Sequence, residues 1–278
     1  MRPLLITLLT LAVSSTATVS QTRNTYEIYA IEYAKAPSPA PISQIAVGST
    51  SRDSVNLWFY FWYLKGNNGS NILVDVGFIK DTLYQRMKDY ERPDLALRPL
   101  HVDPDSITDV IITHAHGDHI DGIDLFKKAK VWMQRNEFTN FVVDAWQKGG
   151  NHLGLDKRDV EKIVRVNLEG RLHLVDGDSI EILPGIRAFI GSKHTFESQH
   201  LLVNTSKEPV LLASDDSWFY VNIDSLYSIP LTFDQPGYIR QLKRMRSLVP
   251  DINLIIPGHD PAVMSRFPKV ADRIVRIR

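Results

Sequence analysis

The hydrophobic and polar positions along the chain follow two kinds of pattern. Runs of about four to eight apolar or alternating residues, bounded by Gly, Pro, Asn or Asp, indicate strands, whereas apolar residues that recur every three or four positions indicate helices. Strand patterns occur at residues 26–33, 54–64, 71–76, 109–113, 131–133, 172–174, 180–183, 186–190, 200–204, 209–213 and 254–256. Helix patterns occur at residues 81–90, 122–128, 137–147, 156–164 and 238–248.

The order of these elements predicts the fold class. The Gly- and Asn-rich turn at residues 66–69 joins the strands at 54–64 and 71–76 into a hairpin. Strands in two sets with helices between them indicate an α/β sandwich in one domain, residues 21–278, with a helical insertion at about 137–165. Residues 58–63 (WFYFWY) carry aromatic side chains on both faces of their strand, which is typical of a strand buried on both sides.

The first twenty residues are typical of a secretory signal peptide. Arg2 is followed by an apolar run at residues 4–13 and by small residues through Ala17 and Ser20, where a signal peptidase can cleave. The run is too short for a bilayer, which needs about 20 residues. We therefore expect export, to the periplasm or the medium, and no membrane span in the mature protein. A buried first strand is the alternative interpretation.

Composition narrows the classes of function. The 278 residues include 32 Lys and Arg and 32 Asp and Glu, so the net charge is zero, which argues against nucleic acid or an anionic membrane as the main partner. The chain has no cysteine, which excludes disulfides, thiolate nucleophiles and cysteine-containing zinc sites. A bound metal would therefore need His, Asp and Glu as its ligands.

One motif has the residue types and spacing of a metal site. Residues 113–122 (THAHGDHIDG) directly follow the predicted buried strand at 109–113. Side chains two positions apart project to the same side of an extended chain, so His114 and His116 can contact one cation. Asp118 and His119 lie on the following turn and can face a neighbouring position. Imidazole and carboxylate are suitable ligands for zinc or a similar divalent ion.

Three later strands end in further potential ligands. His194 follows the strand at 186–190, Asp215 follows the strand at 209–213, and His259 follows the strand at 254–256. Each of these residues, taken singly, is equally well explained as an ordinary loop residue, and Asp216 competes with Asp215. Their succession after the HxHxDH cluster predicts one shared metal centre.

This motif set resembles the metallo-β-lactamase superfamily, as does Asp75 in the sequence ILVDVG at residues 72–77. The resemblance implies an αββα four-layer sandwich with a dinuclear metal centre at one edge of its two sheets, and with Asp75 orienting ligands. Two divalent ions are expected, zinc first, although iron, manganese and cobalt suit the same ligands. The implied ligands are His114, His116 and His194 for one ion, Asp118, His119 and His259 for the other, and a bridging Asp215.

Within the superfamily, two hydrolase groups are similar to this chain: N-acyl homoserine lactonases and glyoxalase II-like thioesterases. The spacing of the last ligands and the segment at 212–222 are closer to the lactonases. We therefore expect a hydrolase that opens lactone rings through attack by a metal-bridging hydroxide on the ester carbonyl. The alternative is a thioesterase or another ester, phosphodiester or β-lactam hydrolase. The expected partner is a small ester or lactone, and a homodimer is compatible with the sequence.

The lactonase resemblance also implies roles for residues near the metals. Asp118 would pass a proton to the leaving alkoxide, and a tyrosine would donate a hydrogen bond to the substrate carbonyl. Tyr220 is the candidate for that tyrosine, although some lactonases place it three positions after the bridging acid, where this chain has Trp218. Lys193 stands where the superfamily commonly has Gly. The aromatic residues that can line a groove for an acyl tail, or else pack in the core, are Trp58, Phe59, Trp62, Phe138, Phe141 and Trp146. Trp218 is a further expected substrate contact.

Overall fold

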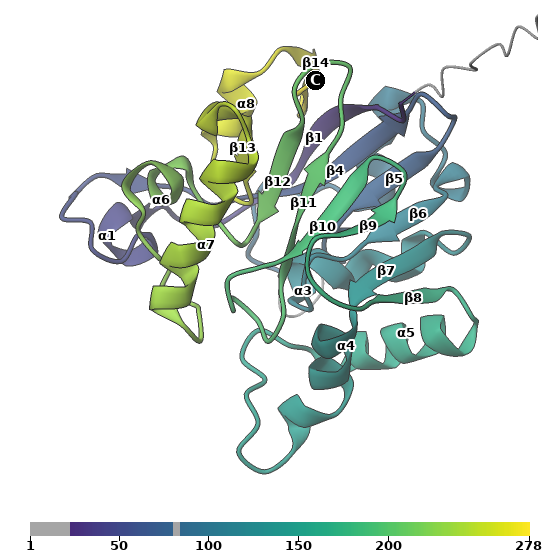
Figure 1. Ribbon diagram of the computed structural model, residues 1–278, viewed down its shortest axis with the longest axis horizontal. Coiled ribbons are helices and arrows are strands. Elements are labelled where there is room, and N and C mark those ends of the chain that lie inside the picture. The colour runs from purple at the N-terminus through teal and green to yellow at the C-terminus, as the bar shows by residue number, and fades with distance from the viewer. Residues whose placement is uncertain (1–22, 80–83) are drawn as a thin grey trace, which may run out of the picture.

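The computed structural model describes residues 23–79 and 84–278, and most of its strands form two sheets (Figure 1). The larger sheet has the strand order β14 (Lys269–Ala271), β15 (Ile274–Arg276), β1 (Tyr26–Lys35), β4 (Trp58–Gly66), β5 (Asn71–Val74), β6 (Asp109–Ile111), β7 (Lys130–Gln134) and β8 (Leu172–Val175). The smaller sheet has the order β13 (Ile255–Pro257), β12 (Val210–Ser214), β11 (Gln199–Val203), β10 (Ile186–Ile190) and β9 (Ile180–Leu183). Two short strands, β2 (Ala40–Pro41) and β3 (Ser54–Val55), pair with each other.

The strand directions bring several strand ends to one edge of the sandwich. β4 and β5 form the predicted antiparallel hairpin, in which Trp62 is paired with Val74. β5 to β8 are parallel neighbours, and β12 and β13 are also parallel. Parallel strands run in the same direction, so their carboxyl ends lie at the same edge of the sheet, where α/β folds commonly bind ligands.

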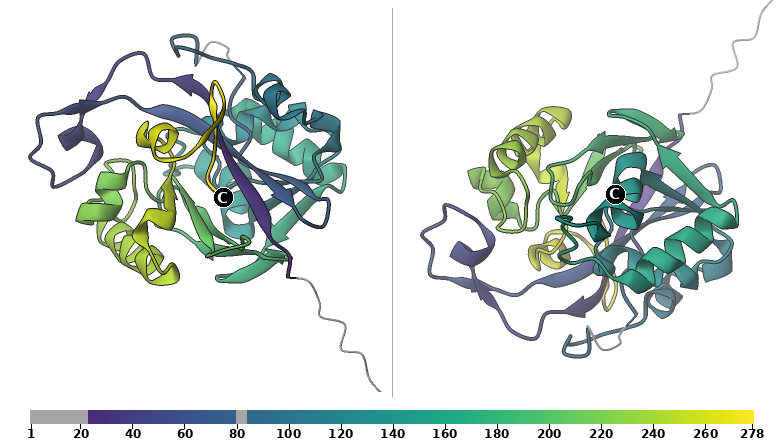
Figure 2. Two further views of the ribbon diagram at one scale, coloured as in Figure 1. Left: turned by 90° about the horizontal axis from the view of Figure 1, so that it is seen from above. Right: turned by 90° about the horizontal axis from the view of Figure 1, so that it is seen from below.

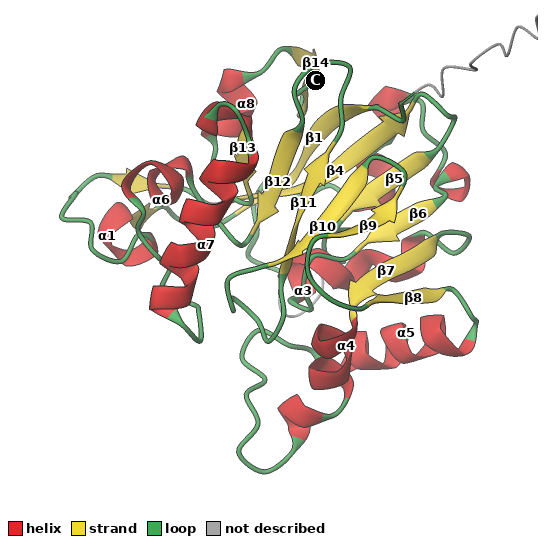
Figure 3. Ribbon diagram, in the orientation of Figure 1, coloured by secondary structure: helices red, strands yellow, loops and turns green. Residues whose placement is uncertain are grey.

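Helices cover the outer faces of both sheets (Figures 2 and 3). The side of the larger sheet carries α2 (Pro93–Ala96), α3 (Gly117–Ile120), α4 (Arg135–Val142) and α5 (Lys157–Leu168), whereas α7 (Gln235–Leu248) packs on β12 of the smaller sheet. The other described helices are α1 (Ile42–Ile45), α6 (Tyr220–Ser225) and α8 (Ala262–Arg266), with 3₁₀ turns at Arg98–Leu100, Pro104–Ser106, Asp121–Leu125, Asp144–Trp146 and Ile252–Leu254. The layers are helix, sheet, sheet and helix, as the resemblance to the superfamily implies.

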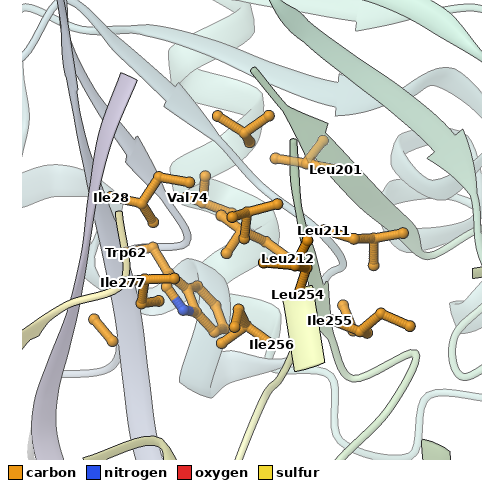
Figure 4. Close-up of a cluster of buried hydrophobic side chains, with 14 of the residues drawn as sticks. Ile28, Trp62, Val74, Leu201, Leu211, Leu212, Leu254, Ile255, Ile256 and Ile277 are labelled. Atoms are coloured by element: carbon orange, nitrogen blue, oxygen red, sulfur yellow. The ribbon is translucent and has the colours of Figure 1, made fainter. Parts of the chain in front are cut away.

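The aromatic strand β4 separates two hydrophobic clusters. Tyr60 and Trp62 point between the sheets, where Trp62 meets apolar side chains of β12 and β13 (Figure 4). Phe59, Phe61 and Tyr63 point to the opposite face, under the helices of the larger sheet. The predicted burial on both faces is therefore confirmed. Phe59 and Trp62 pack in these clusters rather than in an open groove, while Trp58 is only partly buried.

The structure differs from the predicted elements mainly where the backbone is closely packed. The helix expected at 122–128 is a 3₁₀ turn, Asp121–Leu125, instead. Gly122 in this turn packs against the backbone carbonyl of Val76, where a Cβ atom would have no room. The helix expected at 137–147 ends at Val142, and α5 begins after Asp156, whose side chain caps it. Residues 84–90 of the helix expected at 81–90 contain no helix. The sequence pattern predicts no element at the short helices α1, α2, α6 and α8 or at the strands β2, β14 and β15.

Within the described residues, no helix is both long and apolar enough to cross a membrane. The predicted signal peptide at residues 1–20 and residues 81–83 of the expected helix lie outside the described part of the chain. Export therefore stays a prediction from the sequence.

Candidate metal centre

Seven side chains from both sheets converge at the shared edge. Those of the HxHxDH motif follow β6 of the larger sheet, and the other three follow β10, β12 and β13 of the smaller sheet. Their ligand atoms form two groups in which these atoms all lie within 4.8 Å of one another. We call the three-histidine group site A and the other group site B. Site A consists of His114, His116 and His194, together with Asp215, and site B consists of Asp118, His119 and His259.

The carboxylate of Asp215 faces both sites. Its Oδ2 lies 3.1 Å from Nε2 of His194 and 3.8 Å from Nε2 of His114, both in site A. Its Oδ1 lies 3.0 Å from Nε2 of His259 and 3.3 Å from Nε2 of His119, both in site B. One oxygen for each site is the arrangement expected of a bridging carboxylate.

Asp216, the alternative to Asp215, is turned away from both sites. Its Oδ1 accepts hydrogen bonds from the backbone and hydroxyl of Ser192 and from the hydroxyl of Ser198, and its Oδ2 lies 2.8 Å from Nδ1 of His200. Asp216 therefore supports the loop that leads to His194 instead of facing the candidate metal positions.

Unpartnered polar atoms show that this site suits a cation. Nε2 of His114, Nε2 of His119 and Oδ1 of Asp215 are buried without a hydrogen-bond partner. A buried polar group without a partner lowers the stability of the folded protein by about 1–3 kcal/mol, unless a bound ion or another group pairs with it. Burial also lowers the pKa of His114, and lowers that of His116 to about 3, so both imidazoles are neutral at pH 7. Neutral imidazole is the form that binds metal, so these site A histidines fit a divalent ion. Although burial opposes it, neighbouring carboxylates raise the pKa of His119 and of His259. The positive charge that these carboxylates favour in site B is charge that a divalent ion would supply in place of the protons.

In four of the candidate histidine ligands, Nδ1 lies within hydrogen-bond distance of an oxygen outside the ligand set. Nδ1 of His119 lies 2.8 Å from Oδ2 of Asp75, as expected for a residue that orients a ligand. Nδ1 of His194 lies 2.7 Å from the backbone carbonyl of Leu231, and Nδ1 of His259 lies 2.9 Å from that of Trp58. Nδ1 of His114 lies 3.0 Å from the hydroxyl of Thr113. An Nδ1–H that donates to such a partner leaves Nε2 as a lone pair directed into the site.

Three loops of the site contain residues in left-handed backbone conformations. Asp75 has φ = 60°, Lys193 has φ = 62° and Ser214 has φ = 46°. Such residues cost about 1–3 kcal/mol each and are concentrated at functional sites. Lys193 stands where the superfamily commonly has Gly. Its ammonium group donates to the backbone carbonyl of Phe196 at 2.7 Å and lies 4.7 Å from the centre of that ring.

Comparison with known proteins agrees with this geometry. Residues 55–259 match the sequence family described as the metallo-beta-lactamase superfamily. The chain belongs to this superfamily. The predicted family and its α/β fold are thereby confirmed, and membership supports a hydrolase.

Two relatives of this superfamily member are N-acyl homoserine lactonases. One, from Bacillus sp, is 26% identical over 216 residues, which cover 71% of this chain and 80% of that protein. Another, from Bacillus cereus, is 24% identical over 229 residues, which cover 76% and 84%. A solved N-acyl homoserine lactone hydrolase with N-hexanoyl-L-homoserine at its catalytic metal centre has a TM-score of 0.65 at 21% identity, covering 87% of this chain and 96% of that one. At that identity the structural likeness shows the fold alone.

The two aromatic residues after the bridging acid have different surroundings in this superfamily member. The indole N–H of Trp218 donates to Oδ2 of Asp215 at 2.7 Å, and the indole packs edge-on against the rings of His194 and His259. Tyr220 lies in the hydrophobic core under the guanidinium group of Arg266, 3.6 Å from the ring centre, and its buried hydroxyl has no hydrogen-bond partner. The structure thus brings Trp218, and not Tyr220, to the ligand cluster, which corrects the expectation for Tyr220.

The aromatic residues predicted to line a groove are mostly packed elsewhere. Phe138 packs on the core of the larger sheet, and Trp146 stacks on His152. Phe141 is buried in that core and also borders a small cavity beside His116.

Sequence reasoning missed the exposed apolar residues around this cavity. They are Leu153 (65% exposed), Phe196 (41%) and Phe233 (52%). It also missed Glu137, a buried carboxylate that borders the same cavity. The loops that place these residues have no periodic sequence pattern, so their positions could not be predicted. Phe196 is the exception, because it lies two residues after the candidate ligand His194.

Proposed function

We propose that the protein is a metal-dependent hydrolase that opens lactone rings of the N-acyl homoserine lactone type, with two divalent ions, zinc first. The observation that carries the proposal is the division of the Asp215 oxygens between sites A and B. The likeness to N-acyl homoserine lactonases over most of the chain supports the substrate class. A solved relative described as a dizinc lactonase, with a TM-score of 0.63, supports the choice of zinc.

The proposed ligands are the seven side chains of sites A and B. Divalent ions bound there supply Lewis-acid chemistry, which polarises an ester carbonyl and makes water nucleophilic near neutral pH. Asp118 has the most exposed side chain among the site B ligands, at 17%. We assign Asp118 the proton transfer, because this side chain is the one that solvent and a substrate can reach. Its carboxylate would take up the proton that water releases and deliver it to the leaving alkoxide oxygen.

Trp218 supplies the remaining donor near the reacting centre. Its indole N–H is directed at the Asp215 carboxylate, so it holds that carboxylate between the two sites. Since an indole N–H only donates, Trp218 cannot act as an acid or base here.

Exposed apolar side chains beside site A offer a surface on which an apolar tail of the substrate would lie. Leu153, Phe196 and Phe233 border a small cavity that His116 also lines. The loop that carries Leu153 packs tightly on this imidazole, because a Cβ atom on Gly154 would lie 2.6 Å from Cδ2 of His116. Solvent-exposed apolar side chains next to a polar reacting centre are typical of sites for amphipathic small molecules.

The charge pairing on the α5 helix argues against the thioesterase alternative. A basic surface on this helix would favour a thioester with the carboxylates of glutathione. In the structure Arg158 pairs with Asp156, Lys162 with Asp121 and Asp159, and Arg165 with Asp124. The fourth basic residue of this helix, Lys157, lies 5.6 Å from the centre of the Trp146 ring. With three of the four cations in ion pairs, the helix offers little free positive charge to an anionic substrate.

The test is hydrolysis followed by pH-stat with zinc-loaded protein. The panel contains short- and long-chain acyl homoserine lactones, a simple δ-lactone, S-lactoylglutathione and nitrocefin, and the controls are chelator-treated protein and the His116→Ala variant. We expect metal-dependent opening of the lactones and little turnover of the thioester and the β-lactam. Turnover of the thioester or the β-lactam alone would refute the lactonase proposal.

A further inference from the structure

A buried carboxylate outside the seven ligands lies between two ligand-carrying loops. Glu137, in the first turn of α4, is only 2% exposed. Its Oε1 accepts a hydrogen bond from the backbone N–H of Ala115 at 3.0 Å, and its Oε2 accepts one from the backbone N–H of Glu197 at 2.6 Å. Ala115 separates His114 from His116, and Glu197 comes three residues after His194.

The two loops are tied to each other at a second place, nearer to their strands. The backbone N–H of Gln199 donates to the carbonyl of Thr113 at 2.9 Å, and the side-chain amide of Gln199 donates to the carbonyl of Ile112 at 2.8 Å. These bonds join the ends of β6 and β11. The Glu137 carboxylate joins the loops farther out, beside the imidazoles, and hydrogen bonds to a charged acceptor are roughly twice as strong as neutral ones.

This bridge concerns site A and not site B. The rings of His116 and His194 have centres 4.6 Å apart, and those of His114 and His194 are 4.7 Å apart, so site A depends on the separation of the two loops. In site B, His119 is held by Asp75 and His259 by the carbonyl of Trp58, and no contact described for these side chains involves Glu137.

We propose that Glu137 is a positioning residue that fixes the distance between the two loops and thereby sets the metal affinity of site A, while site B is independent of it. This inference rests on the metal-binding function proposed above. Residues that hold metal ligands from behind typically change metal affinity by about 10- to 100-fold when they are replaced. The same loss is expected here, at one site of the pair.

Two substitutions perturb the bridge in different ways. Glu137→Gln keeps the shape of the side chain but places an N–H₂ group against one of the two backbone N–H donors. Glu137→Asp keeps the charge, but the side chain is one methylene shorter and cannot reach both loops. Asp144→Asn is the matched control, because it removes the same charge from an exposed position that follows the same helix.

Each site is isolated by removing one ligand from the other. In a His259→Ala background site B is disabled and zinc binding reports on site A, whereas in a His114→Ala background it reports on site B. Zinc affinity is measured by competition with a chromophoric chelator, and urea unfolding of each metal-free protein is followed by circular dichroism. We expect Glu137→Gln and Glu137→Asp to weaken site A by about 10- to 100-fold and to leave site B unchanged, and we expect Asp144→Asn to change neither site.

The possible outcomes separate this inference from the proposed function. If the wild type binds no zinc, the proposed function fails and the inference fails with it. If the wild type binds two zinc ions and Glu137→Gln retains the affinity of site A, only the role of Glu137 is refuted. Equal weakening of both sites, or failure of both Glu137 variants to fold, would show a general structural role and would also overturn the inference.

Discussion

Replacement of Asp75 by Asn tests how the site selects the metal-binding form of a histidine. The buried Asp75 carboxylate accepts hydrogen bonds from the backbone N–H of Thr113 at 2.8 Å and from the hydroxyl of Ser214 at 3.1 Å, and it lies 2.8 Å from Nδ1 of His119. Every partner can donate, which suits an ionised carboxylate. An amide of the same shape offers one acceptor and one donor instead.

The amide donor that Asp75→Asn introduces has two possible effects on His119. If the imidazole keeps its proton on Nδ1, two donors face each other, and a buried unsatisfied donor costs about 1–3 kcal/mol. If the proton moves to Nε2, site B loses the lone pair that is directed inward. We therefore expect the metal-free variant to be less stable by about 2 kcal/mol and its zinc affinity at site B to fall by about 10- to 100-fold.

Urea unfolding of the metal-free proteins measures the first effect, and zinc titration in the His114→Ala background measures the second. Asp272→Asn is the control, because that side chain is 92% exposed and its loss should change stability by less than about 0.5 kcal/mol. An Asp75→Asn protein with the stability and the site B affinity of the wild type would refute the reasoning.

Three further predictions concern the site and its supports. Trp218→Phe should lower lactone turnover by about tenfold or more, because a hydrogen bond to a charged group is lost. Tyr220→Phe should retain turnover, because its hydroxyl has no hydrogen-bond partner. Initial rates of lactone hydrolysis by the two variants test both expectations. Chelation should lower the unfolding temperature, because zinc at a hundredfold excess over its Kd stabilises the folded state by about 2.7 kcal/mol, and an unchanged calorimetric transition would contradict this. Burial raises the pKa of Asp159 from 3.8 to about 7. Between these pH values the folded chain binds more protons than the unfolded chain, so it loses stability as the pH rises through them. Asp159→Asn should reduce the difference between the unfolding free energies measured in urea at pH 5 and at pH 8, and the same difference in both proteins would disprove this.

The strands and the converging ligands could be predicted because both depend on local sequence. β1, β9 and β10 lie where alternating residues place them, and β4 is buried on both faces as its aromatic run predicts. The seven candidate ligands all follow strands, and parallel strands bring their carboxyl ends together without any further information from loops. For these residues, position in the chain was enough to predict one shared centre, whereas their division between two sites and the bridging place of Asp215 came from the resemblance to the superfamily.

The substrate side of the site could not be predicted, because it depends on how loops pack. Tyr220 and Trp218 are two residues apart, yet one is drawn into the core and the other contacts Asp215. Phe138 and Trp146 have the spacing of a helix face, but the helix ends at Val142 and turns them toward different neighbours. Glu137 could not be predicted because its hydrogen-bond partners are backbone amides of distant loops. Every residue has a backbone amide, so the sequence does not distinguish these partners.

The contact between Trp218 and Asp215 makes tryptophan fluorescence a probe of the candidate metal centre. An indole whose N–H donates to a carboxylate, and whose ring packs edge-on against histidines of both sites, has an emission that depends on the charge around it. Binding of cations at sites A and B would change that charge at close range. A change in the Trp218 emission of the wild type on addition of a metal ion would therefore report occupancy, and can follow metal uptake in real time without added dye or substrate.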